Sequence, residues 1–86
     1  MTDQELFMKN QQLSTELELY LSEHPELEER IPDNAMIVLL PEYDKELSSK
    51  NLDLAIKNKE KGQTIVYVKV RSLRTSRIEG LELQFT

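Results

Sequence analysis

The chain has 86 residues, a formal net charge of −5 and no cysteine. This length predicts one small domain with a thin margin of stability, and the missing cysteines exclude disulfide bonds and thiolate metal sites. The acidic balance disfavours nucleic-acid binding, for which a basic domain is expected. The first residues lack the features of a signal peptide, and the longest apolar run, 35–40, is too short to span a membrane. We therefore expect a soluble cytoplasmic domain.

The charges are divided unevenly along the chain. Residues 1–50 contain four basic and twelve acidic side chains, whereas residues 51–86 contain seven basic and four acidic ones. Such a division is typical of a protein with an electropositive contact surface. It also arises when two halves of one domain neutralise each other, and the sequence is compatible with both interpretations.

The first expected element is a helix over residues 3–23. Apolar residues at helical spacing predict a face that packs on the core, made of Leu6, Phe7, Leu13, Leu17, Tyr20 and Leu21. Met8 and Leu19 fall on the opposite, polar face. They are interpreted either as scattered surface residues or as a contact with another chain.

The middle of the chain predicts a short helix and then a strand. A proline ends the first helix and begins a short acidic helix over 25–30. After a turn, the continuous apolar run 35–40 indicates a strand that is buried on both faces, as in parallel sheets.

A second long helix and a second strand complete a βαβ unit. Residues 42–61 have helical spacing with Gly62 as the C-terminal stop, and the β-rich run 64–70 indicates a strand. The helix has a wider apolar arc than packing on one sheet requires, and Asn51 and Asn58 lie within this arc. The width predicts burial from two sides: by the sheet, and by either the first helix or a second subunit.

The C-terminal residues have the pattern of an edge strand. Leu81, Leu83 and Phe85 alternate with polar residues, which is typical of a half-buried strand. The expected fold is therefore a single α/β domain over residues 1–86. It has a small sheet with a parallel βαβ unit, an N-terminal helix packed on it and a C-terminal edge strand, which pairs within the chain or with a neighbour.

No residues form a specific catalytic, cofactor or metal signature. His24 is the only histidine, and its place beside a proline indicates a role at a helix end. The acidic residues around it (Glu26, Glu28, Glu29 and Asp33) lack the pattern of a calcium loop and match the acidic start of a helix. We therefore expect no cofactor and no metal, and the sequence gives no positive indication of an enzyme.

An arginine-rich segment follows the second predicted strand. Arg71, Arg74, Ser76 and Arg77 are chemically suited to a phosphate, a carboxylate or a charged partner. The alternative is that these arginines form ion pairs with the acidic half of the chain.

The leading functional hypothesis is a non-enzymatic binding or protein-interaction module that acts as a homodimer. Surplus apolar surface motivates it, and the candidate interface residues are Met8, Leu19, Leu52, Ile56, Leu83 and Phe85. The expected partner is a second copy or another protein, and no membrane contact is expected. The alternative is a domain that binds a small phosphate or carboxylate ligand through segment 71–77, with or without enzymatic activity.

Several short runs of the sequence resemble a small prokaryotic family of uncharacterised proteins. The runs that carry the resemblance are residues 10–14 (NQQLS), 24–27 (HPEL), 31–35 (IPDNA), 39–42 (LLPE) and 62–69 (GQTIVYVK). The resemblance covers most of the chain and implies one coherent domain. It implies no activity, cofactor or site residue.

Overall fold

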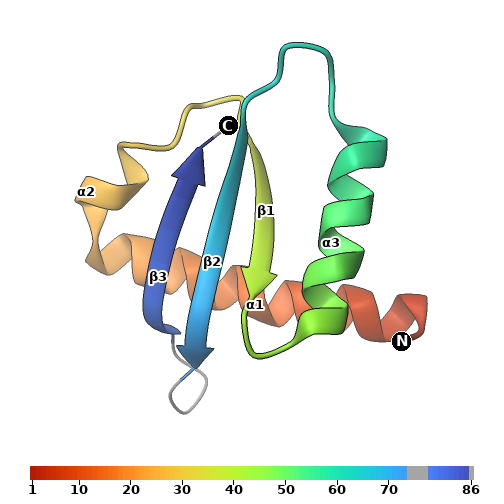
Figure 1. Cartoon of the computed structure of the whole chain (residues 1–86). Coiled ribbons are helices and arrows are strands. Elements are labelled where there is room, and N and C mark those ends of the chain that lie inside the picture. The colour runs from red at the N-terminus through yellow and green to blue at the C-terminus, as the bar shows by residue number, and fades with distance from the viewer. Residues whose placement is uncertain (74–77, 86) are drawn as a thin grey trace.

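The computed structural model describes residues 1–73 and 78–85. Its elements are α1 (Asp3–Glu23), α2 (Pro25–Glu28), β1 (Met36–Pro41), α3 (Lys45–Asn58), β2 (Ile65–Leu73) and β3 (Ile78–Phe85). The strands form one sheet in the order β1-β2-β3, with β1 parallel and β3 antiparallel to β2 (Figure 1). The predicted α/β class with its parallel βαβ unit is confirmed, and the C-terminal strand pairs within the chain.

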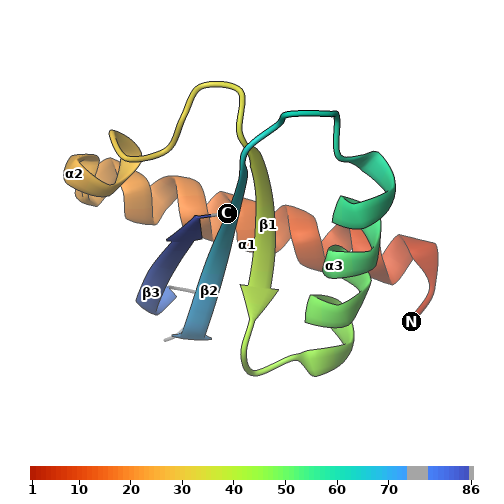
Figure 2. The same cartoon turned by 45° about the horizontal axis from the view of Figure 1, so that its top comes forward.

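Helix α1 covers one face of the sheet. It begins with a capping box, in which Thr2 Oγ1 accepts from Glu5 N–H at 3.1 Å and Glu5 Oε1 accepts from Thr2 N–H at 3.2 Å. Figures 1 and 2 show the helix crossing behind all three strands. The largest buried cluster lies between these two layers and contains Leu13, Leu17, Leu39, Leu47, Val66, Val68, Val70 and Ile78.

The prediction that Phe7 packs on the core is wrong. Phe7 is 66% exposed, whereas its neighbour Leu6 packs against the core. Successive residues of a helix differ by about 100° in direction, so when Leu6 faces the core its neighbour Phe7 points away from it.

Helix α3 is shorter than predicted at both ends. It begins after Asp44, whose Oδ1 accepts from Leu47 N–H at 3.1 Å as an N-cap, so residues before Lys45 belong to the turn. It ends at Asn58 because Lys59 has extended backbone angles. Gly62 is therefore not the residue that stops the helix, and its φ of +79° serves the turn that leads into β2.

Strand β1 is buried on both faces only in part. A second, smaller cluster of Val38, Ala55 and Ile65 lies where α3 packs on β1. Ile37, in contrast, is 39% exposed, because it alternates with Val38 and so lies on the opposite face from α3, on a strand at the edge of the sheet. Within the described residues, no helix is long and apolar enough to cross a membrane.

Candidate functional site

The direction of the main-chain groups determines what each edge of the sheet offers. Glu42 N–H donates to the carbonyl of Val70 at 2.8 Å, so the main-chain groups of Glu42 face β2. Because main-chain groups alternate in direction along a strand, Leu39 and Pro41 turn theirs toward the outer edge of β1.

Two side chains of α3 close this outer edge. Asn51 Nδ2 donates to the carbonyl of Leu39 at 2.8 Å, and Ser48 Oγ donates to the carbonyl of Pro41 at 2.7 Å. Pro41 has no N–H, so its position at the outer edge leaves no donor unpaired. Two of the carbonyls that an additional strand would need, those of Leu39 and Pro41, are therefore already occupied.

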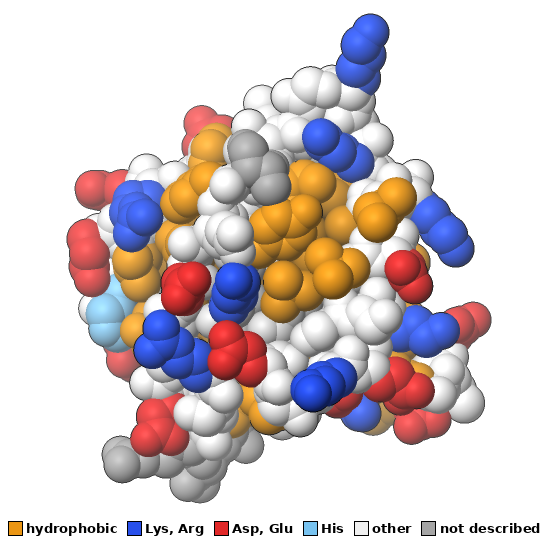
Figure 3. All heavy atoms as spheres, in the orientation of Figure 1, with side chains coloured by type: hydrophobic (Ala, Val, Ile, Leu, Met, Phe, Trp, Pro, Cys, Tyr) orange, Lys and Arg blue, Asp and Glu red, His pale blue; other side chains and the backbone are white. Residues whose placement is uncertain are grey.

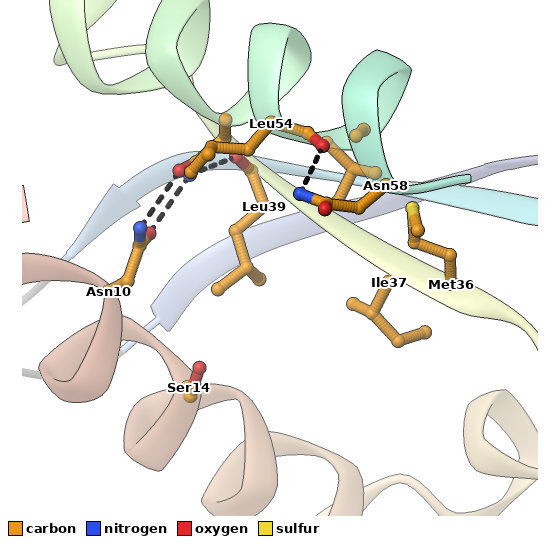
Figure 4. Close-up of a pocket in the computed structure, with 10 residues that line it drawn as sticks. Asn10, Ser14, Met36, Ile37, Leu39, Leu54 and Asn58 are labelled. Atoms are coloured by element: carbon orange, nitrogen blue, oxygen red, sulfur yellow. Dashed lines mark hydrogen bonds between the residues drawn. The ribbon is translucent and has the colours of Figure 1, made fainter. Parts of the chain in front are cut away.

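Asn51 also joins α3 to α1 (Figure 4). Its Nδ2 donates to Asn10 Oδ1 at 2.9 Å, and Asn10 Nδ2 donates to Asn51 Oδ1 at 2.8 Å. Asn51 is 8% exposed, yet both hydrogens and the oxygen of its amide have partners. The wide apolar arc of α3 predicts burial from two sides, and at Asn51 the two neighbours are β1 and α1.

A groove of 310 Å³ continues from this amide pair along β1, between α1 and α3 (Figure 4). Its described lining residues are all uncharged: Asn10, Ser14, Met36, Ile37, Val38, Leu39, Asn51, Leu54, Ala55 and Asn58. These residues can form hydrogen bonds with neutral groups. They supply neither an acid–base group nor a strong metal ligand.

The opposite edge, at β3, is open. The Val70 carbonyl faces β1, so the main-chain groups of its neighbour Lys69 face β3. Lys69 pairs with Glu82 of β3, and the residues on either side of Glu82 turn their main-chain groups outward. These outward-facing residues are Leu81 and Leu83, and Phe85 follows with the same alternation. Among the described residues, none donates to or accepts from their outward main-chain groups.

The six predicted interface residues lie in more than one region. Leu83 is half-buried on β3, and Phe85 is 40% exposed with the Arg30 guanidinium carbon 5.6 Å from its ring centroid. Leu19 lies near the start of β3, where it shares a pocket with Ile78. The remaining exposed residues belong to the N-terminal half of α1 or to α3, and are Met8, Leu52 and Ile56.

The arginine-rich segment is only partly described. Arg71 Nη2 lies 3.3 Å from Glu82 Oε2, and Lys69 Nζ lies 4.0 Å from Glu82 Oε1. Arg71 thus forms an ion pair, but with a residue of the basic half of the chain. The other candidates, Arg74, Ser76 and Arg77, lie outside the described residues.

His24 occupies a helix end, as predicted. It is the C-cap of α1, its Nδ1 donates to the Tyr20 carbonyl at 2.9 Å, and its ring stacks on the Tyr20 ring at 4.1 Å. In the part of the chain that the structure describes, no group of three His, Asp or Glu side chains could hold a metal ion.

The ionisable groups with shifted pKa values lie at helix starts. The hydrogen bond from Leu47 N–H lowers the pKa of Asp44, and the ion pair with Lys9 at 3.2 Å adds to this effect. Hydrogen bonds with Thr2 lower the pKa of Glu5 in the same way. Burial raises the pKa of Tyr43, and the neighbouring carboxylate raises it further.

Sequence reasoning missed two residues that organise the closed edge, Asn10 and Ser48. Asn10 stands four residues after Leu6 and three before Leu13, which places it on the core face of α1. A polar residue on that face is a signal for a buried hydrogen bond. Ser48 follows Leu47 in α3, and no pattern in the sequence indicates that its hydroxyl donates to the carbonyl of Pro41 in β1.

The fold defines a small α/β domain in which a helix packs on a three-stranded mixed sheet. The chain belongs to a family of unknown function, DUF5647, whose sequence profile matches residues 5–81. This match confirms the resemblance to a family without an assigned function. No curated protein and no solved structure gives a significant match.

Proposed function

We propose that the chain is a non-enzymatic protein-interaction module that acts as a homodimer, with two copies paired through the outer edges of β3. The observation that supports this proposal is the difference between the two edges of the sheet. Side chains of α3 occupy the outward carbonyls of Leu39 and Pro41 on β1, whereas no side chain of the described residues occupies the outward main-chain groups of β3. Proteins commonly protect free strand edges because such edges pair with other strands, so the open edge is the natural site of association.

The sequence of β3 favours an antiparallel pair centred on Leu83. In this register Leu83 faces itself across the two-fold axis, and Leu81 faces Phe85 of the second copy. All outward-facing groups of these residues then find partners. Glu82 faces Gln84 of the second copy, whereas a register centred on Glu82 would place two like charges opposite each other.

Side-chain burial supports the same arrangement. Leu81, Leu83 and Phe85 pair with the buried valines of β2, so their side chains lie on the sheet face that α1 covers. Pairing two copies extends this apolar row across the interface and shields Phe85, which is 40% exposed in the single chain. A chain of 86 residues without disulfide bonds gains stability from such an extension of its core.

Sedimentation equilibrium with charge variants of Gln84 tests the proposal. Gln84→Glu places two carboxylates opposite each other in each of the two symmetry-related pairs. We expect it to weaken the dimer by about two- to thirtyfold, because the two cross-strand charge pairs each contribute about 0.2–1 kcal/mol. Gln84→Lys places an ammonium opposite Glu82 and is expected to strengthen the dimer by a similar factor.

Gln4→Glu and Gln4→Lys are the matched controls. Gln4 is exposed in the first turn of α1, so these variants change the net charge equally and leave β3 untouched. A strict monomer at high micromolar concentration would overturn the homodimer. A dimer that responds to the Gln4 and Gln84 variants alike would overturn the β3 interface.

A further inference from the structure

A pocket of 470 Å³ lies between the C-terminal half of α1 and the start of β3. Glu16, Tyr20 and His24 line it from the side of α1, and Ile78 lines it from β3. It is separate from the groove beside β1, with which it shares no described lining residue.

Glu16 is an unusual residue in this pocket. It is 9% exposed, and its Oε2 is shielded from water and has no hydrogen-bond partner. An ionised carboxylate without a partner is destabilising when it is buried, so proteins normally pair such groups. Among the described residues no group pairs with Oε2, and a partner from outside the chain would compensate it.

We propose that this pocket binds the cationic side chain of a lysine or arginine from another protein. The unpartnered Oε2 of Glu16 is a hydrogen-bond acceptor when the group is a carboxylate. His24 Nδ1 donates to the Tyr20 carbonyl, and in the tautomer that makes this bond Nε2 is left as an acceptor. Ammonium and guanidinium groups are donors with a positive charge, and they match these acceptors. The apolar side chains of Leu19 and Ile78 suit the aliphatic stem that carries such a group.

The charge of the surrounding surface favours the same ligand. Between Glu16 and Asp33 the sequence has seven acidic side chains and one basic side chain, Arg30. Acidic side chains gather on the side of the molecule where the single histidine lies (Figure 3). Glu23 and Glu79 also line the pocket, and each already interacts with another group, so they add to the negative field without being counted as free acceptors.

An organic cation fits this pocket better than a metal ion does. Among the described residues, no three His, Asp or Glu side chains are placed to coordinate a metal. One deeply buried carboxylate beside apolar and aromatic side chains, with the exposed Glu23 and Glu79 also lining the pocket, instead resembles a site for one cationic side chain.

Titration by nuclear magnetic resonance with the peptide acetyl-Ala-Arg-Ala-amide tests this inference. We expect the arginine peptide to shift the amide signals of residues 16–24 and Ile78, and a lysine peptide to shift the same signals. The peptide with citrulline in place of arginine has nearly the same shape without the charge and should not bind. Glu16→Gln should weaken arginine-peptide binding about tenfold or more, because it removes one partner of a buried charge pair.

Glu18→Gln is the matched control, because Glu18 is exposed on α1 and is not among the residues that line the pocket. Glu16→Gln should also melt at the same or a higher temperature than the wild type, which separates lost binding from lost folding. Equal binding of the citrulline peptide, or equal losses in Glu16→Gln and Glu18→Gln, would overturn the site. Since Gln84 does not line this pocket, the Gln84 variants should bind the arginine peptide normally whether or not the chain dimerises.

Discussion

Asn10 and Asn51 exchange a reciprocal pair of side-chain hydrogen bonds of 2.8 and 2.9 Å, although they stand 41 positions apart in the sequence. The same Asn51 amide holds the carbonyl of Leu39 at the outer edge of β1. One buried side chain therefore connects two helices and, together with Ser48, occupies carbonyls at one edge of the sheet. This closure makes the open edge at β3 distinctive.

Replacing Asn51 should destabilise the fold strongly. Asn51→Leu keeps the branching and the number of side-chain heavy atoms but leaves the Leu39 carbonyl and the Asn10 amide without their partner. Because unsatisfied buried polar groups each cost about 1–3 kcal/mol, we expect a loss of roughly 2 kcal/mol or more in the free energy of unfolding, measured by urea titration. Asn58→Leu is the control, since Asn58 is exposed and donates only to its own helix at Leu54. Equal losses in both variants would show that the Asn51 network contributes little.

The cap at Asp44 should make stability depend on pH at the acidic end. The folded pKa of Asp44 is lowered from its ordinary value of 3.8, chiefly by the hydrogen bond from Leu47 N–H. A depressed carboxyl pKa contributes stability above the unfolded value, and this contribution is lost as the pH falls through the folded value. In Asp44→Asn the amide accepts the same bond without titrating. The difference in unfolding free energy between wild type and variant should therefore shrink below about pH 4.

Lys9→Gln separates the cap from the ion pair at Asp44. This variant removes the 3.2 Å contact between Lys9 Nζ and Asp44 Oδ2 but leaves the cap intact. Because the cap is the larger cause of the pKa shift, Lys9→Gln should keep most of the acid dependence attributed to Asp44. If this dependence disappears in Lys9→Gln, the ion pair is its main source.

Two apolar residues of similar chemistry should respond differently to truncation. Val68 is fully buried in the centre of the sheet, whereas Ile56 is 77% exposed on α3. Val68→Ala should lower the free energy of unfolding by on the order of 2 kcal/mol, because it leaves a cavity in a close-packed core. Ile56→Ala should change it by less than about 0.5 kcal/mol. Denaturant titration of both variants checks the contrast, and a large loss in Ile56→Ala would indicate that its side chain is covered.

The two glycines should differ because only one has a positive φ. Gly62 has φ +79° with open space where a Cβ atom would lie, so Gly62→Ala should lose about 1 kcal/mol through backbone strain alone. At Gly80 an added methyl group would meet Arg71 Cδ at 3.4 Å, which is the flexible side chain of an exposed residue. We expect Gly80→Ala to be the milder change in thermal melting. The reverse order would show that β3 packs more tightly than its exposure suggests.

The sequence by itself determined the order and type of the elements, because these depend on local spacing. The leucines of α1, the apolar run that becomes β1 and the β-rich run that becomes β2 each have one periodicity over a short window. Alternation in the last residues likewise indicated an edge strand. The same local patterns could not place the ends of α3, since its start depends on the side chain of Asp44 and its end on the backbone of Lys59.

Only the tertiary structure decided which groups meet. Asn51 was visible as an amide within an apolar arc, but its partners Asn10 and Leu39 lie on other elements, and sequence spacing does not encode such contacts. Pairing of β3 with β2 rather than with a neighbouring chain likewise followed from the folded arrangement. Glu16 was one acidic residue among many in the sequence, and only the packing of α1 on the sheet shows that its Oε2 is buried without a partner among the described residues. Burial and hydrogen bonding between distant elements are properties of the packed layers, and a linear pattern reports only which face a residue is on.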